Sequence, residues 1–148
     1  MVINGIDLVK IEPLTPFYSN KMVENGVSYG LSEAGYDIRI RQAVALNPTK
    51  KFVLASTVEY FTMPENIVAV VHDKSTWARQ GLSVFNTVIE PGWRGYLTLE
   101  LVYHGNDDLF IPAGSGIAQV LFHQLSGNAS YGGKYQNQPD CPVEAKFT

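Results

Sequence analysis

The amino-acid sequence predicts an all-β protein that folds as a sandwich or distorted barrel with a single short helix. Thirteen glycines and eight prolines interrupt its 148 residues at short intervals. The runs between them alternate apolar and polar side chains, as half-buried strands do. Many short strands with almost no helix favour a sandwich or a barrel. The clearest strand candidates are Tyr36–Ile40, Lys51–Ala55, Ile67–His72, Tyr96–Tyr103 and Ile117–His123.

The one convincing helix covers Ser75–Gln80. Asp73 or Ser75 can cap its start, and Gly81 stops it. We expect residues 1–32, which show little periodicity, to wrap around the barrel. Residues 126–148 are rich in Gly, Asn, Gln and Pro. Two interpretations stay open for them: a disordered tail, or a flexible lid that orders over a ligand.

Length and composition indicate one globular domain spanning residues 1–148. Apolar residues make up 45% of the chain and charged residues 17%, which argues against a disordered protein. A net charge of −3 argues against binding to a nucleic-acid backbone, although a few local cations could hold one triphosphate. Cys141 is the only cysteine, so no internal disulfide can form, and no segment has the pattern of a signal peptide or a membrane span. We therefore expect a soluble cytoplasmic protein.

A hydroxyl and two cations gather at the start of the predicted helix, in Lys74, Ser75 and Arg79. Helix N–H groups, this hydroxyl and the cations could together hold a phosphate. A plain capped helix with solvated cations explains the same pattern equally well. Further on, Glu90-Pro-Gly-Trp93 is either a simple hairpin turn or a turn that offers an aromatic side chain for stacking on a sugar.

Glu100 is the one carboxylate in the predicted strand Tyr96–Tyr103. Glu100 should lie away from the main core, at a cleft or a subunit boundary, because strand alternation separates it from the leucines. An exposed strand residue with a salt-bridge partner is the commoner alternative. The alternation along this strand sets Leu97, Leu99, Leu101 and Tyr103 on one face, and Thr98, Glu100 and Val102 on the other.

Asp37 has a similarly simple interpretation, as a partner of Arg39 or Arg41.

A protein-bound catalytic zinc is not expected. Zinc sites of nucleobase-modifying hydrolases need a His-x-Glu and a Pro-Cys-x-x-Cys sequence. Here His72 is followed by Asp73 and Lys74, and Cys141 has no second cysteine to act with. The other two histidines, His104 and His123, are isolated in the sequence.

The motifs, taken in their order along nearly the whole chain, resemble the dCTP deaminase branch of the dUTPase-like superfamily. No single motif is decisive, but several in the right order make a specific match. The matching stretches are Val27-Ser-Tyr-Gly-Leu-Ser, Gly35-Tyr-Asp-Ile-Arg, Thr57-Val-Glu-Tyr-Phe, Lys74-Ser-Thr-Trp-Ala-Arg, Glu90-Pro-Gly-Trp-Arg-Gly, Leu97-Thr-Leu-Glu-Leu, Ala118-Gln-Val-Leu-Phe and Gly132-Gly-Lys-Tyr-Gln.

This resemblance implies a distorted, jelly-roll-like β-barrel that assembles as a homotrimer, with each active site built at a subunit interface. It implies deamination of free dCTP to dUTP and ammonia without zinc, with Mg2+ bound through the triphosphate rather than by the protein. The partners implied are dCTP and dUTP, further copies of the chain, and neither nucleic acid nor membrane.

Carried over position by position, Glu100 matches the family's catalytic glutamate, and Ser75 and Arg79 match the serine and arginine beside it. Trp93 stands where the superfamily places an aromatic residue near the deoxyribose. Tyr131 and Tyr135 belong to the segment expected to close over the ligand. Gln119, Lys134 and Gln138 match phosphate-handling positions, and the other residues expected to bind substrate are Lys74, Thr76, Asn86, Thr87 and Glu90.

Two other functions stay open. A dUTPase releases pyrophosphate from dUTP with an aspartate where this chain has Glu90, and the longer carboxylate would displace the attacking water. Plain dUTPases also carry an apolar residue at the position of Glu100, so the sequence favours deamination, alone or followed by dUTP hydrolysis to dUMP. A non-catalytic nucleotide-binding trimer has no chemical need to retain Ser75, Arg79 and Glu100 together. After Gln138 the chain departs from the family pattern, with Pro139-Asp-Cys-Pro in place of an early glycine.

Overall fold

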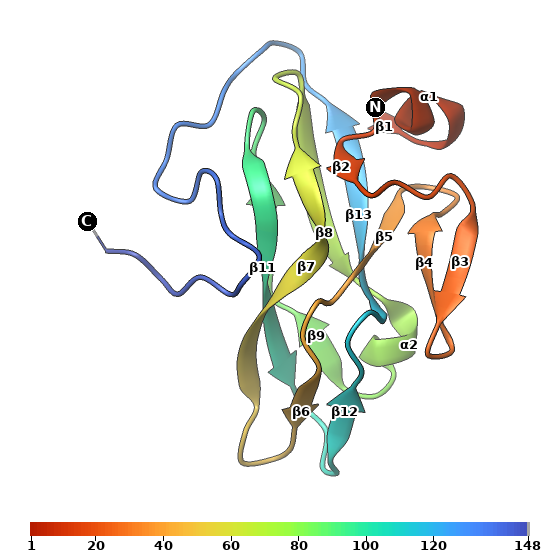
Figure 1. Ribbon diagram of the computed structural model, residues 1–148, viewed down its shortest axis with the longest axis vertical. Helices are drawn as coiled ribbons and strands as arrows, with labels where there is room; N and C mark the ends of the chain where they lie inside the picture. The colour runs from red at the N-terminus through yellow and green to blue at the C-terminus, as the bar shows by residue number, and fades with distance from the viewer. Residues whose placement is uncertain (148) are drawn as a thin grey trace.

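Thirteen strands and two short helices make up the part of the chain described by the computed structural model, residues 1–147 (Figure 1). No helix within these residues is long and apolar enough to cross a membrane. In chain order the elements are β1 (Val2–Ile3), α1 (Gly5–Ile11), β2 (Leu14–Thr15), β3 (Lys21–Glu24), β4 (Val27–Leu31), β5 (Tyr36–Arg39), β6 (Val44–Leu46), β7 (Phe52–Thr62), β8 (Ile67–Asp73), α2 (Ser75–Ala78), β9 (Leu82–Val84), β10 (Val88–Ile89), β11 (Arg94–Tyr103), β12 (Leu109–Ile111) and β13 (Gly116–Gln124).

The strands form two main antiparallel sheets that curl around one core, as the all-β prediction requires. The larger sheet has the order β10-β8-β13-β5-β4-β3, with β1 added beside β13. The smaller sheet has the order β2-β7-β11-β9, and β12 pairs separately with β6. A bridge between Ile40 and Thr57 joins the sheets where β5 passes β7. The predicted all-β distorted barrel is thus the observed architecture.

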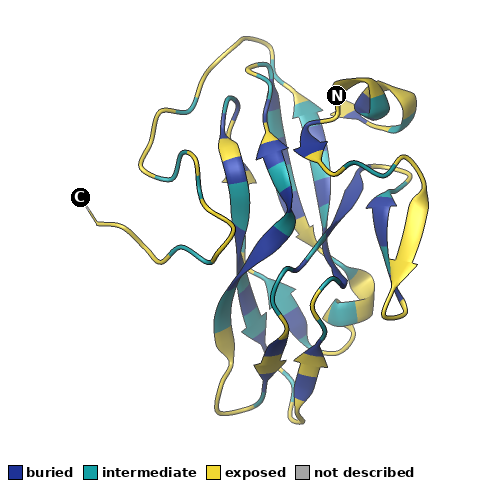
Figure 2. Cartoon of the chain, viewed as in Figure 1, coloured by how far each residue is buried: buried dark blue, intermediate teal, exposed yellow. Residues whose placement is uncertain are grey.

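The core lies between the two sheets, where Figure 2 shows the buried stretches of β5, β7, β11 and β13 facing inward. Ile38 and Phe122 of the larger sheet and Phe61, Leu99 and Leu101 of the smaller one are fully buried. These residues alternate with more exposed ones along their strands, which is the pattern from which the strands were predicted. Burial of such side chains stabilises the fold by roughly 1.5–3 kcal/mol each.

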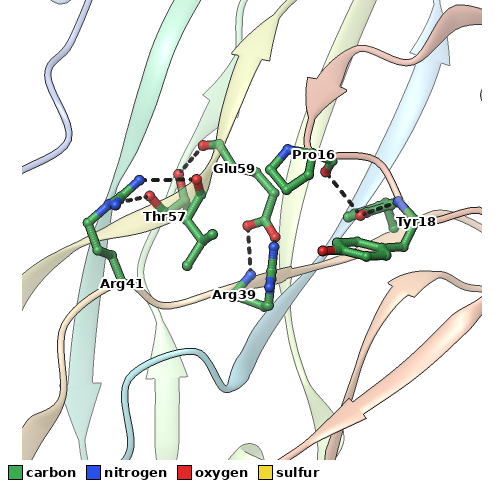
Figure 3. Close-up of polar contacts among 8 residues, drawn as sticks. Pro16, Tyr18, Arg39, Arg41, Thr57 and Glu59 are labelled. Carbon is green, nitrogen blue, oxygen red and sulfur yellow. Dashed lines mark hydrogen bonds and ion pairs between the residues drawn. The ribbon is translucent and has the colours of Figure 1, made fainter.

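One ion pair is buried between the sheets. The Nε of Arg39 on β5 lies 2.8 Å from Oε2 of Glu59 on β7, and the Arg39 backbone N–H donates to the other carboxylate oxygen. Figure 3 shows the two side chains facing each other, with Arg41 beside Thr57, which precedes Glu59 by two residues on β7. The rings of Tyr18 and Tyr29 enclose the Arg39 guanidinium. The pair therefore fixes the two sheets against each other.

All five predicted strands are present, but the helices differ from the prediction. The predicted strand Lys51–Ala55 is only the start of the longer β7, and α1 was not predicted at all. Helix α2 ends at Ala78, and its N-cap is Lys74 without a side-chain hydrogen bond, so neither Asp73 nor Ser75 caps it. Asp73 Oδ1 instead accepts a 2.6 Å hydrogen bond from the Val84 N–H, which ties the end of β8 to β9.

Candidate active site

A cavity of about 650 Å³ lies beside β11, within the range of small-molecule sites. Its walls come from three parts of the chain that are distant in sequence: the strand pair β7 and β11, the loop and short strand from residue 85 to 90, and the C-terminal segment. Sequence reasoning placed several of these residues in the site, but it missed the apolar walls. The unpredicted lining residues are Phe52, Leu54, Phe85, Val88, Ile89, Leu97, Val143 and Ala145.

Glu100 projects into this cavity from β11 and is half-buried. Partial burial raises the pKa of its carboxyl above the ordinary value, because desolvation disfavours the charged form. Among residues 1–147, no side chain forms a hydrogen bond or ion pair with this carboxylate. The structure therefore does not support the alternative of a Glu100 paired in a surface salt bridge. Its carboxylate is free to exchange a proton with a ligand.

Asn86 holds the backbone of β11 on both sides of Leu99. Its Nδ2 donates to the Thr98 carbonyl at 2.7 Å, and its Oδ1 accepts the Glu100 N–H at 2.9 Å. The Phe85 N–H adds a 2.6 Å bond to the Glu100 carbonyl. Because both ends of the Asn86 amide are occupied by backbone groups, this residue positions Glu100. Thr87 and Glu90 also line the cavity, and both are exposed.

The pairing of β11 with β7 is irregular beside the cavity. Tyr96 pairs with Tyr60 and Thr98 pairs with Ser56, so residues 57–59 of β7 oppose Leu97 alone. The Leu97 N–H donates to Thr57 Oγ1 at 3.0 Å, which satisfies a group that a regular ladder would have paired with backbone. Strict alternation places Leu97 with the core leucines, and Leu97 does pack against the core, although it is less buried than Leu99 and Leu101. Leu97 is half-buried and lines the cavity with Thr98 and Glu100.

Trp93 lines the cavity and follows directly after the turn at Pro91 and Gly92. The indole is buried and its Nε1–H donates to the Tyr135 carbonyl at 2.6 Å. The Trp93 N–H returns to the Glu90 carbonyl at 3.2 Å, so the predicted turn is formed. The indole therefore contributes a rigid apolar surface to the cavity.

The C-terminal segment lines the cavity of its own chain. Gln138 forms a parallel bridge with Gly95, and its Oε1 accepts a 3.0 Å bond from the Thr98 hydroxyl. The Val143 N–H donates to the same hydroxyl oxygen at 3.1 Å. Tyr131 and Gln138, both predicted site residues, line the cavity. Lys134 does not: its ammonium contacts the Lys146 carbonyl outside the cavity.

The remaining predicted residues form a second group around α2, and none of them lines the cavity. Ser75, Thr76 and Arg79 are exposed on α2, on the side of the barrel away from the C-terminal segment (Figure 1). Gln119, on β13, donates to the Ser32 hydroxyl at 3.0 Å. One chain thus holds the predicted catalytic residues in two separate places.

Lys74 is paired within the fold. Its Nζ lies 2.7 Å from Asp37 Oδ2 and 3.0 Å from Ser28 Oγ. Asp37 is therefore a partner of Lys74, and the predicted pairing with Arg39 or Arg41 is wrong. Arg39 is already paired with Glu59, and Arg41 donates to the carbonyls of residues 57 and 58.

Within residues 1–147, no group of three His, Cys, Asp or Glu side chains is arranged to hold a metal ion. Of the three histidines, His104 contacts the Ser83 hydroxyl at 2.9 Å through Nε2. The free thiol of Cys141 is exposed.

Comparison with known proteins decides the family. A family model described as dCTP deaminase-like matches residues 33–125, more than half of the chain. The chain belongs to the dCTP deaminase-like family. It is 36% identical to a dCTP deaminase from Protochlamydia amoebophila, with 88% of this chain and 89% of that protein covered. It is 37% identical to a dCTP deaminase from Acinetobacter baylyi and 35% identical to one from Helicobacter pylori, with 80% and 84% of this chain covered.

Solved structures share the fold of this family member at lower identity. The native dUTPase of EIAV superposes with a TM-score of 0.57 at 22% identity, covering 68% of this chain and 82% of that one. A dUTPase from the Staphylococcus aureus phage phi11 superposes with a TM-score of 0.59 at 16% identity, covering 82% of this chain and 94% of that one. At these identities the likeness concerns the fold.

Proposed function

We propose that this protein deaminates dCTP to dUTP and ammonia, with Glu100 as the group that transfers protons. The observation that carries the proposal is an unpaired, half-buried carboxylate inside a cavity of nucleotide size. A carboxyl whose pKa is moved toward neutrality can act as a base and then as an acid near neutral pH. Relatives that are 35–37% identical over most of the chain are named dCTP deaminases.

The chemistry replaces the C4 amino group of cytosine by oxygen. In the proposed mechanism, the Glu100 carboxylate takes a proton from water as the water oxygen forms a bond to C4, and it delivers that proton to N3. It then moves the second proton of the water-derived hydroxyl to the amino nitrogen, so that the C4–N bond breaks, ammonia leaves and the C4 carbonyl of uracil forms. The overall balance is dCTP plus water giving dUTP plus ammonia.

We assign Ser75 to orienting the attacking water and Arg79 to fixing geometry and charge balance at the same site. Because α2 does not border the cavity of its own chain, we propose that both residues come from a neighbouring subunit of a homotrimer. In this arrangement each active site takes Glu100 from one subunit and Ser75 and Arg79 from its neighbour.

The proposed substrate pose sets the deoxyribose against Trp93, with Thr87, Glu90 and Tyr131 around the mouth of the cavity. We assign Lys74, Thr76, Gln119, Lys134 and Gln138 to the triphosphate end. Asn86 acts through the backbone of β11. The C-terminal segment, which contacts Thr98 through residues 138 and 143, is proposed to be a lid over the bound nucleotide.

Mg2+ is proposed to accompany the triphosphate. Among residues 1–147, no three His, Cys, Asp or Glu side chains are grouped around a common point, and phosphate oxygens and water are ligands that Mg2+ prefers. When bound, the ion would neutralise part of the phosphate charge. The protein's own task is then to hold the base against Glu100.

The experiment is the replacement of Glu100 by Gln. Loss of the proton-transferring group is expected to reduce dCTP turnover roughly 10²–10⁴-fold. Glu24→Gln, which removes a fully exposed carboxylate on β3, is the matched control and should keep normal turnover. Near-normal release of ammonia by the Glu100→Gln protein would refute the assignment.

One incubation separates the competing functions. Wild-type protein is supplied with Mg2+ and, separately, with dCTP, dCMP, dUTP or CTP, and ammonia and pyrophosphate are measured. Release of ammonia without pyrophosphate from dCTP identifies a deaminase. Release of both ammonia and pyrophosphate from dCTP identifies a bifunctional enzyme. Pyrophosphate from dUTP alone identifies a dUTPase, and binding without either product identifies a regulatory trimer. The position of Trp93 predicts that CTP is not converted.

A further inference from the structure

Helix α2 has only four residues; Ser75 is the first of them and Arg79 is the C-cap residue, and both of these predicted catalytic side chains lie outside the cavity. A single helical turn does not persist by itself in water, because nucleation fixes several dihedral angles for one hydrogen bond. It also lacks a side-chain cap at its N-terminus. The position of Ser75 and Arg79 must therefore be set by contacts that α2 makes with the rest of the barrel.

The first of these contacts is the ion pair between Lys74 and Asp37. Lys74 is the N-cap residue of α2, and Asp37 lies on β5, in the larger sheet. Their side chains are 11% and 8% exposed, and 2.7 Å separates the ammonium nitrogen from the carboxylate oxygen. The Ser28 hydroxyl on β4 accepts a second bond from the same ammonium at 3.0 Å. The start of α2 is thus tied to two strands.

The second contact is made one turn later. Trp77 Nε1 donates a 2.6 Å hydrogen bond to the Gly116 carbonyl on β13, and the indole packs against the edge of the core. The backbones of β4 and β13 approach so closely here that a Cβ on Gly116 would lie 2.0 Å from the Ser28 carbonyl oxygen. Both contacts of α2 therefore rest on a single closely packed surface formed by β4, β5 and β13.

We infer that Asp37 is a positioning residue for the deamination: its ion pair with Lys74 sets where α2 presents Ser75 and Arg79 to the neighbouring subunit. This inference rests on the proposed function. A buried ion pair contributes little net stability, because the cost of desolvating two charges offsets their attraction, and its better-attested use is to specify one arrangement. The Lys74 ammonium has two partners inside its own subunit, Asp37 and Ser28. The main effect of the ion pair is therefore on the placement of α2.

The test removes both charges at once, in Asp37→Asn/Lys74→Met, so that no unpaired charge is left buried. The matched control is Arg39→Met/Glu59→Gln, which removes the other buried ion pair of β5 without touching α2. We expect the first variant to lose at least tenfold in kcat for dCTP, in addition to any rise in KM that follows from removing the Lys74 charge. The control, once folded, should keep its kcat. A rise in KM with unchanged kcat would mean that Lys74 only holds phosphate, and it would overturn the inference.

A second readout follows α2 directly. The indole N–H of Trp77 gives its own NMR signal, identified with Trp77→Phe, and its exchange with solvent reports the bond to Gly116. The exchange should become faster in Asp37→Asn/Lys74→Met and stay slow in the control. A fall in kcat without faster exchange overturns the inference. If the wild-type protein does not convert dCTP, the proposed function fails, while the Trp77 signal still decides whether Asp37 positions α2.

Ser28→Ala covers the case in which the double variant does not fold. This variant removes only the 3.0 Å bond to Lys74 and leaves both charges paired. We expect a fall in kcat of about two- to fivefold, as the loss of one modest hydrogen bond allows, and a smaller increase in Trp77 exchange. An unchanged kcat together with an unchanged Trp77 signal would count against the inference.

Discussion

Glu100 is held half-buried in the folded protein, and no cation among residues 1–147 forms an ion pair with it. Desolvation therefore raises the pKa of its carboxyl above the ordinary value of 4.5. When the pH is below the ordinary pKa, the Glu100 carboxyl is protonated in the folded and in the unfolded protein. At higher pH the carboxyl ionises first in the unfolded chain, so ionisation favours unfolding. The free energy of unfolding therefore falls as the pH rises from the ordinary pKa through the raised pKa of the folded protein.

Replacing Glu100 by Gln should therefore stabilise the protein at neutral and alkaline pH. We expect a higher melting temperature than wild type at about pH 8, and a difference that shrinks at about pH 4, where Glu100 is protonated. Differential scanning calorimetry at fixed protein concentration measures both. A Glu100→Gln protein that melts below wild type at the higher pH would contradict this account of the carboxyl.

Glu59 is a fully buried carboxylate that stabilises the fold and does not line the cavity. It is inaccessible to solvent, and burial raises its pKa against the lowering effect of the bonds from Arg39. Glu59→Gln leaves the Arg39 guanidinium buried without its counter-charge, and breaking such a pair costs about 3–5 kcal/mol of unfolding free energy. Urea denaturation measures the change. Glu33→Gln, which breaks the exposed pair with Lys21, should leave the midpoint unchanged.

At the scale of elements, contact between β11 and the C-terminal segment depends on Gly95. This glycine has φ +143°, and a Cβ there would lie 2.6 Å from the Gln138 backbone nitrogen. Gly95→Ala should push the segment away from β11 and release the Tyr96 N–H, which donates to the Gln138 carbonyl at 3.1 Å. Hydrogen exchange measured by mass spectrometry should show faster exchange at Tyr96. Gly127→Ala, where nothing lies within 4 Å, is the control and should exchange as wild type does.

The elements that the sequence predicts well are those with an uninterrupted alternation of apolar and polar residues. Strand β11 has this pattern over Leu97–Leu101. The later part of β7 does not, because Ser56, Thr57 and Glu59 are polar yet buried and hydrogen-bonded. Helix α1 escapes prediction because it begins at Gly5 with φ +54° and has no side-chain cap bond. Its only buried residue is Leu8, which is too little for a visible period.

At the scale of the whole molecule, the sequence identifies the kinds of residue in the site but not their grouping. Motifs name Ser75, Arg79 and Glu100 as one set. In the folded chain, only Glu100 faces the cavity. The apolar walls from Phe85 and Val143 were not predictable either, because no periodicity links a loop to a tail almost sixty residues later. Tertiary folding alone brings those two segments together.

This separation predicts complementation between two inactive variants. Arg79→Ala and Glu100→Gln should each be nearly inactive as pure trimers. After subunit exchange in an equal mixture, a site that takes Arg79 from one subunit and Glu100 from its neighbour is intact in about one quarter of cases. The mixture should therefore recover about one quarter of the wild-type turnover per site.

The same mixture without subunit exchange is the control and should stay inactive. Absence of recovery after exchange, with mixed trimers demonstrated by native mass spectrometry, would place both residues in one subunit. A monomer in analytical ultracentrifugation would remove the basis of the proposal altogether.

The pairing of β1 with β13 also has a consequence for how the protein folds. Val2 lies opposite His123 and Ile3 opposite Phe122, so β1 cannot pair until β13, the last of the described strands, has been synthesised. At roughly 5–20 residues per second, the ribosome takes several seconds to supply that partner. Such sequence-remote antiparallel contacts are typical of domains that fold in milliseconds to seconds. The barrel is therefore expected to close only after β13 has been translated, and until then the apolar faces of the earlier strands need protection from aggregation.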